Sequence, residues 1–176
     1  MENTWLSLLV IMVVVGAAVT DFRWQKIPNL ITFPSMVVGI VGHGVVHGWD
    51  GLSFSLSGLG LGLVLLLGFY AMGGMAAGDV KLMAAVGSFL GPVNVFLVFL
   101  MTAILGGFYS IGMMIQSLGF RGMVEHVALM FKTLFLTGKI KMAFAGNTES
   151  EVKLRYGLVI ALGTLTFQFW YWIGIG

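Results

Sequence analysis

Long apolar runs, separated by charged residues or by Gly and Pro, make up most of this chain. A helix needs roughly 20 mostly apolar residues to cross a bilayer. The pattern therefore predicts an all-α membrane protein with about six transmembrane helices, near residues 3–20, 28–47, 52–73, 80–97, 98–118 and 156–175. The boundary between the fourth and fifth helices is poorly marked, because Gly87, Gly91 and Pro92 interrupt the fourth.

An amphipathic helical pattern follows the fifth predicted helix. From residue 120 to 144, apolar residues recur at spacings of three and four, with Arg121, Glu125 and Lys132 on the opposite face. This period predicts an amphipathic helix that lies on an anionic membrane surface, with its cations among the headgroups. The alternative is a plain cytoplasmic linker. The whole amphipathic and polar segment extends over about 119–155.

Composition requires a bilayer as the solvent. Hydrophobic residues make up 59% of the chain and charged residues 9%, and the mean hydropathy is +1.01. So few polar side chains do not cover a water-soluble globule. The chain has no cysteine, which excludes disulfides, thiolate metal sites and cysteine nucleophiles within it.

The positions of the charges predict the topology, whereas the small net charge of +2 predicts little. All nine Lys and Arg residues fall in three alternate loops: Arg23 with Lys26, then Lys81, then the stretch 121–155. By the positive-inside rule, the N-terminus lies outside and these three loops lie in the cytoplasm.

Two carboxylates stand at predicted cytoplasmic helix ends, Asp21 after the first helix and Asp79 before the fourth. Ionisable groups at membrane depth are costly unless they are paired or hydrated, and they are candidates for function. The alternative is that each is a solvated boundary residue near Arg23 or Lys81. If the two meet, repulsion leaves one proton on the pair. We expect it mostly on Asp21, because a helix C-terminus disfavours negative charge.

The residues around these carboxylates resemble the type IV prepilin peptidases, in the short form linked to tight-adherence (Flp) pili. The resemblance rests on Asp21 followed by Ile27-Pro28-Asn29, and on the motif from Gly73 to Gly87 that contains Gly78-Asp79-Val80-Lys81. It extends over roughly residues 20–163. Two spaced motifs with matching topology are more specific than either alone.

The resemblance implies an intramembrane aspartic endopeptidase of the bacterial inner membrane, formed by residues 1–176 as a single domain. Such enzymes remove the short basic leader of prepilins at the cytoplasmic face. By motif match, Asp21 and Asp79 are the catalytic pair, and the supporting active-site residues are Gly78, Lys81, Pro28 and Asn29. The expected partners are a prepilin and membrane lipid, with no nucleic acid, metal or cofactor.

This chain departs from the family pattern at two places. Ala76 stands where the family's GxGD motif has glycine, so the loop is expected to be stiffer here. Arg155-Tyr156-Gly157 stands where relatives often have proline before the aromatic residue. Methyl transfer is not expected, because the cysteine-rich domain of larger relatives is missing from this chain.

Other polar residues are weaker candidates. His43 and His47, with Asp50 three residues further on, have a spacing that can hold a metal. A stacked histidine pair with Asp50 capping the next helix explains that spacing equally well. Glu149 and Glu151 are candidates for holding a basic leader on charge alone. The remaining two features are His126, expected to contact headgroups, and Trp170-Tyr171-Trp172, expected to form an outer aromatic belt.

Two other classes of function remain open on the sequence. One is a small transporter or channel with Asp21 and Asp79 as a cation or proton relay, although relay carboxylates normally lie near the bilayer midplane. The other is a non-catalytic subunit of a secretion apparatus.

Overall fold

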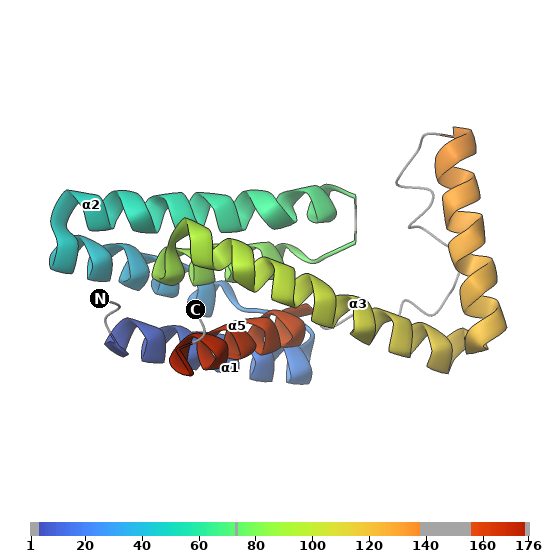
Figure 1. The fold of residues 1–176 in the computed structure, drawn as a ribbon, viewed down its shortest axis with the longest axis horizontal. Coiled ribbons are helices and arrows are strands. Elements are labelled where there is room, and N and C mark those ends of the chain that lie inside the picture. The colour runs from blue at the N-terminus through green and yellow to red at the C-terminus, as the bar shows by residue number, and fades with distance from the viewer. Residues whose placement is uncertain (1–3, 73, 138–155, 175–176) are drawn as a thin grey trace.

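The computed structural model describes residues 4–72, 74–137 and 156–174, and these are almost entirely helical, as predicted (Figure 1). The elements are α1 (Thr4–Trp24), α2 (Asn29–Ala71), α3 (Ala77–Thr137) and α5 (Tyr156–Trp172). In this part of the chain, three helical stretches are long and apolar enough to cross a membrane: Trp5–Trp24, Asn29–Ala71 and Ala77–Gln116. The expected number of six crossings therefore stays a prediction.

Glycines with positive φ divide the two longest helices. Gly48 (φ 59°) interrupts α2, and Gly91 (φ 76°) and Gly119 (φ 70°) interrupt α3. The chain reverses direction at Gly48 and Gly91, so α2 and the first part of α3 each form a helical hairpin (Figure 1). Side chains other than glycine rarely adopt this backbone conformation. The boundary predicted after residue 97 was wrong, because the turn is at Gly91.

The first rod of α3, residues 77–90, lies at the centre of the bundle. Every residue from Leu82 to Gly91 is buried. Its side chains share a core with Val14 of α1, Leu66 of α2 and Ile160 of α5. A helix that is apolar on all sides is stable only when it is surrounded. This rod can therefore be short, since its neighbours and not lipid cover it.

Small residues bring α2 and α3 into close contact. A Cβ atom on Gly58 would collide with the Gly87 carbonyl oxygen, and one on Gly62 would collide with the Met83 carbonyl oxygen. Gly60, which lies between them in sequence, has open space on its outer side. The GxxxG pair Gly58 and Gly62 thus allows the backbone approach that such pairs provide in membrane helices.

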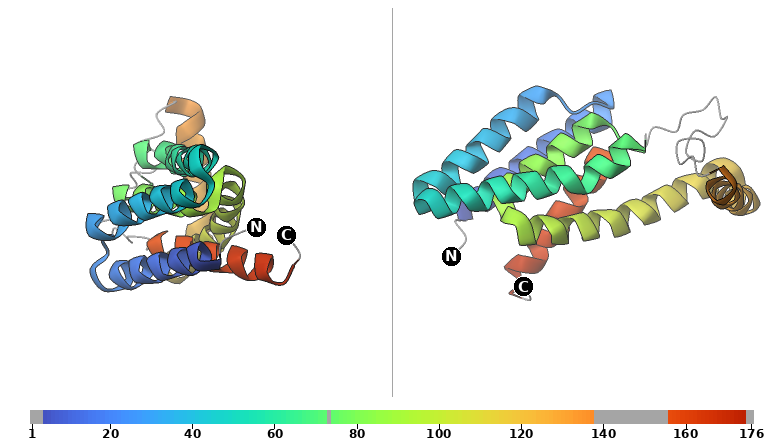
Figure 2. Two further views of the ribbon diagram at one scale, coloured as in Figure 1. Left: turned by 90° about the vertical axis from the view of Figure 1, so that its left-hand side faces the viewer. Right: turned by 90° about the horizontal axis from the view of Figure 1, so that it is seen from above.

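The bundle has two distinct ends. One end holds the N-terminus of α1, the turns at Gly48 and Gly91, and the C-terminus of α5; the opposite end holds the starts of α2, α3 and α5 and the C-terminus of α1 (Figures 1 and 2). We call the latter the site end. The cations Arg23, Lys26 and Lys81 all lie in the segments at the site end.

After Gly119, α3 turns across the direction of the rods and continues as a helix to Thr137 (Figures 1 and 2). The predicted amphipathic helix is confirmed as a helix over this range. Glu125 and Lys132 are exposed on it, as are Val124 and Leu129. Residues 138–155, with Glu149 and Glu151, lie outside the described residues.

Candidate active site

Asp79 occupies the third position of α3 and is only 5% exposed. Its Oδ2 accepts a hydrogen bond from the backbone N–H of Ala76, at 3.1 Å. Ala76 precedes the helix and accepts the Asp79 N–H at its carbonyl oxygen, also at 3.1 Å. A carboxylate that reaches back to the residue before the helix forms half of a capping box. This local bond fixes Asp79 at the mouth of the helix.

Ala76, which stands where the family motif has glycine, is accommodated without strain. Its side chain is exposed. Among the described non-glycine residues, only Gln25 has a positive φ, so the backbone at position 76 does not require glycine. The methyl group therefore does not alter the capping bond, and the expected stiffening of the loop stays a prediction.

Asp21 lies in the last turn of α1 and is 6% exposed. Its Oδ2 accepts a hydrogen bond from the backbone N–H of Leu158, at 3.3 Å. Leu158 is in the first turn of α5, where free N–H groups favour negative charge. Asp21 lies at the C-terminus of α1, as predicted, but it also accepts a bond at the N-terminus of α5. Both carboxylates accept bonds at helix N-termini, which removes our reason for placing a shared proton on Asp21.

Ile27, in the loop between α1 and α2, joins the surroundings of the two carboxylates. A Cβ on Gly78 would lie 3.2 Å from the Ile27 Cβ, and a Cβ on Gly157 would lie 2.8 Å from the Ile27 Cδ1. Gly78 precedes Asp79, and Gly157 packs against the Asp21 side chain. The two acids therefore lie in one neighbourhood at the site end.

The alternative of two solvated boundary residues does not fit this burial. Lys81 donates a hydrogen bond to the side-chain oxygen of Asn29, at 2.9 Å, and its Nζ lies 5.1 Å from the centre of the Phe33 ring. Lys81 is thus held at the start of α2.

The predicted supporting residues connect the starts of α2 and α3. Pro28 is the residue before α2, with φ −66° and ψ 141°, and Asn29 begins the helix. Proline favours this entry geometry because its φ is fixed. Asn29 then holds Lys81 of α3. These three residues lie at the site end and contact each other or their helices; their roles in a reaction stay predictions.

Sequence reasoning assigned no role to Gly157 or Leu158, and it used Ile27 only as part of the Ile27-Pro28-Asn29 motif. The Tyr156-Gly157 pair stood out only as part of a departure from the family pattern. Its position suggested a helix start, and a helix start is a source of free N–H groups. That signal was present, but nothing in the sequence says which carboxylate, 137 positions earlier for Leu158, would receive the bond.

The histidine pair has a structural explanation. His43 is buried, and its Nε2 donates to the Phe89 carbonyl oxygen at 2.8 Å, which ties α2 to the central rod. The His43 and His47 rings are 6.2 Å apart. Asp50 accepts the Ser53 hydroxyl at its backbone carbonyl. Among the described residues, no three His, Asp or Glu side chains gather as metal ligands.

The aromatic residues that end α5 divide into packed and exposed rings. Trp170 and Tyr171 pack near Phe167, with ring centres 6.3 and 6.1 Å away. Trp172 is 66% exposed. They lie at the end opposite the site end (Figure 1), and an outer aromatic belt stays a prediction.

Together, the fold and the site define an all-helical membrane protein with two buried carboxylates at one end of its bundle. The model of the type IV leader peptidase family matches residues 7–111, which include Asp21 and Asp79. This chain therefore belongs to the type IV leader peptidase family and is a peptidase of that kind. No curated protein and no solved structure matches it. The helix α5, which supplies Leu158, lies outside the matched residues.

Proposed function

We propose that this protein is an aspartic endopeptidase of the bacterial inner membrane that removes the short basic leader from Flp-like prepilins. Asp21 and Asp79 are its catalytic pair, and the site end faces the cytoplasm. In this proposal, the rods of α1, α2, α3 and α5 cross the membrane six times, and the part of α3 after Gly119 lies on the inner membrane surface.

One observation carries the proposal: two carboxylates from separate helices are both buried at the same end of the molecule, on either side of Ile27. Burying a carboxylate costs several kcal/mol unless its surroundings compensate. The compensation here includes one backbone N–H for each acid, from Ala76 and Leu158. Two neighbouring carboxylates that share one proton are the arrangement of aspartic peptidases.

The pair carries one proton in the reactive state, because like charges at low dielectric do not both remain ionised. The ionised carboxylate removes a proton from water as the water oxygen bonds to the scissile carbonyl carbon. The protonated acid gives its proton to the carbonyl oxygen. In collapse, the C–N bond breaks, the amine nitrogen takes from one acid the proton that came from water, and the other carboxylate takes a proton from one of the two hydroxyls. The new carboxyl group leaves with the leader, and the pair holds one proton again.

The substrate fits the distribution of polarity. A prepilin has a basic leader before the cut and an apolar helix after it, so the helix enters the bilayer while the leader stays in the cytoplasm. The scissile bond then lies at the depth of Asp21 and Asp79. Arg23, Lys26 and Lys81 at the site end support this orientation by the positive-inside rule.

The direct test is hydrolysis of a prepilin peptide by the purified full chain in detergent. Asp21→Asn and Asp79→Asn should each lower the rate by at least about 100-fold, since each removes one partner of the acid–base pair. Asp50→Asn is the matched control, because Asp50 is exposed and lies next to the turn at Gly48, at the opposite end. It should leave the rate unchanged.

The outcomes separate the three classes of function. Hydrolysis lost in both site variants and kept in the control supports the peptidase. Hydrolysis kept in either site variant refutes the pair. Absence of hydrolysis in the unaltered chain, together with proton uptake into proteoliposomes that depends on both acids, would favour the transporter. Absence of both activities would favour a non-catalytic subunit.

The orientation has a separate test. Because the chain has no cysteine, single cysteines at Gln25 and at Trp49 can be labelled without background. Both positions are exposed and lie at opposite ends of the bundle. In intact cells with a permeable outer membrane, an impermeant thiol reagent should label position 49 and not position 25. The reverse pattern would place the site end outside.

A further inference from the structure

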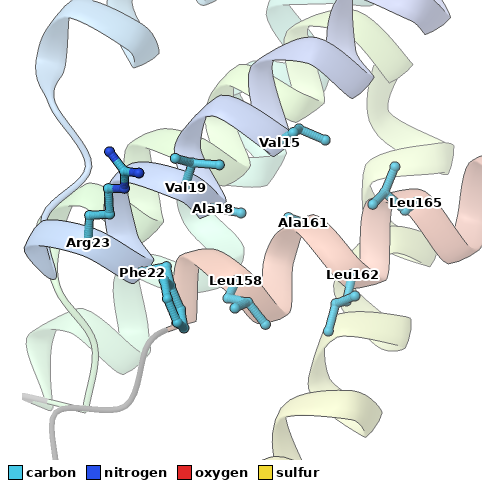
Figure 3. Close-up of a pocket in the computed structure, with 9 residues that line it drawn as sticks. All are labelled: Val15, Ala18, Val19, Phe22, Arg23, Leu158, Ala161, Leu162 and Leu165. Carbon is cyan, nitrogen blue, oxygen red and sulfur yellow. The ribbon is translucent and has the colours of Figure 1, made fainter.

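An apolar groove of about 500 Å³ lies between α1 and α5 on the outer surface of the bundle. It is lined by one charged residue, Arg23, and eight apolar ones. Figure 3 shows Arg23 at one end of the groove, and Val15 and Leu165 at the other. The groove therefore has a cationic end, at the site end of the bundle, and an apolar body.

The length of the groove matches part of one lipid leaflet. From Val15 to Arg23 the helix rises about 12 Å, whereas the hydrocarbon core of a bilayer is about 30 Å thick. The groove thus starts at the level of the helix ends and stops short of the bilayer midplane. A transmembrane helix of a partner would extend far beyond it.

The apolar body of the groove suits a single acyl chain, which is thinner than a helix and needs no hydrogen-bond partners. The lining side chains are also the type that packs against hydrocarbon, including Phe22, Leu158 and Leu162.

Charge indicates the class of headgroup. Within the described part of the chain, Arg23 forms no ion pair, and its side chain is exposed. A guanidinium binds phosphate oxygens through two parallel N–H groups. The same cation repels a basic leader peptide, so the groove does not favour the substrate's charged segment.

We propose that this groove binds an anionic phospholipid, with the phosphate at Arg23 and one acyl chain between α1 and α5. The site is separate from the carboxylate pair but adjoins it. Leu158 lines the groove with its side chain and donates its backbone N–H to Asp21. A bound lipid therefore packs against the two helices that hold this acid.

The test measures lipid binding to the full chain in detergent by native mass spectrometry. The probes are phosphatidylglycerol and phosphatidylcholine with identical acyl chains. The unaltered protein should bind phosphatidylglycerol more tightly. Arg23→Gln should weaken that binding about fivefold and leave phosphatidylcholine unchanged. Lys26→Gln is the matched control: Lys26 is an exposed cation of the same loop that does not line the groove, and the change should have less than a twofold effect.

Variants that fill the groove test its apolar body. Ala18→Phe and Leu162→Trp both enlarge lining residues, one from each helix, and each should weaken binding of both lipids. Leu162 is 47% exposed, so its replacement keeps the test valid if Ala18→Phe does not fold. Asp79→Asn should bind lipid as the unaltered chain does, which keeps this test independent of peptidase activity.

Three results would overturn the proposal. An equal loss of phosphatidylglycerol binding in Arg23→Gln and Lys26→Gln would indicate diffuse electrostatic attraction of the lipid to the protein surface. Unchanged lipid binding in folded Ala18→Phe and Leu162→Trp would exclude the groove as the site of the acyl chain. Crosslinks from position 162 to the apolar helix of a prepilin, without specific lipid binding, would assign the groove to the substrate.

Discussion

Gly157→Ala is the substitution that best tests whether α5 positions Asp21. An added Cβ at position 157 would lie 2.9 Å from the Asp21 Oδ2, 3.0 Å from the Asp21 Cβ and 2.8 Å from the Ile27 Cδ1. Ordinary van der Waals contact begins near 3.4 Å. The Ile27 terminus can rotate away, but Asp21 is confined by its own helix and by the bond from Leu158.

The size of the effect follows from this geometry. Relieving the contact with Asp21 requires a displacement of about half an ångström, shared between the carboxylate and the start of α5. Overpacking of this kind costs about 1–3 kcal/mol in stability. Misplacement of a reacting group by about 1 Å can lower a rate by about 100-fold. We therefore expect hydrolysis to decrease by about 10- to 100-fold while the protein remains folded.

The assay is hydrolysis of a prepilin peptide in detergent, combined with thermal unfolding of the same samples. Gly107→Ala is the matched control. Gly107 is also a helical glycine, but its Cβ would meet nothing within 4 Å. It should keep full activity, and helix propensity should make it neutral or up to about 1 kcal/mol more stable.

Activity of Gly157→Ala within about twofold of the unaltered rate would refute the reasoning, because the packing of α5 would then have no bearing on Asp21. A loss of activity that matches an equal loss of folded protein would also count against it. The diagnostic result is a rate loss in a sample that still unfolds cooperatively.

Three further predictions concern the scaffold. Gly58→Ala should destabilise the protein by about 1–3 kcal/mol through collision with α3, whereas Gly60→Ala should not. Equal melting temperatures of these two variants in detergent would contradict close packing at Gly58. Gln25→Gly should stabilise the protein by about 0.5–1 kcal/mol, because Gln25 directly follows α1 and has a φ of 50°. A lower melting temperature would show that the Gln25 side chain matters more than its backbone. The effects of Lys81→Met and Asn29→Ala on the free energy of unfolding should depart from additivity by about 0.5–1 kcal/mol in a double-mutant cycle, since the two residues share one hydrogen bond. Strict additivity would mean that this bond contributes nothing to stability.

Local pattern was enough for the helices and for the position of each acid within them. The apolar run before Asp21 predicted the first helix as 3–20, and the structure has Thr4–Trp24. The glycine and proline at 91–92 were recognised as an interruption, but the turn was placed later. The reason is that apolar residues continue on both sides of Gly91, so hydropathy alone does not locate the reversal; the positive φ of Gly91 does.

The candidate site shows the same division between local and long-range information. Asp79 could be placed at a helix N-terminus from sequence, because its capping partner Ala76 is three residues away. The surroundings of Asp21 could not, because Leu158 comes from a helix 137 positions later. Our argument for placing the shared proton on Asp21 was incomplete for this reason: it counted the carbonyls of α1, which are local, and omitted the N–H groups of α5, which are not.

The sequence by itself determined that the chain needs a bilayer, where most of its helices lie, and which two acids stand at helix ends. Each of these depends on composition or on neighbours within a few residues. Only the tertiary structure decided that residues 82–91 are the buried centre, that Ile27, Gly78 and Gly157 pack around one site, and that α1 and α5 leave a groove ending at Arg23. Such contacts join segments far apart in the chain, and their geometry depends on how glycines and side chains let whole helices approach.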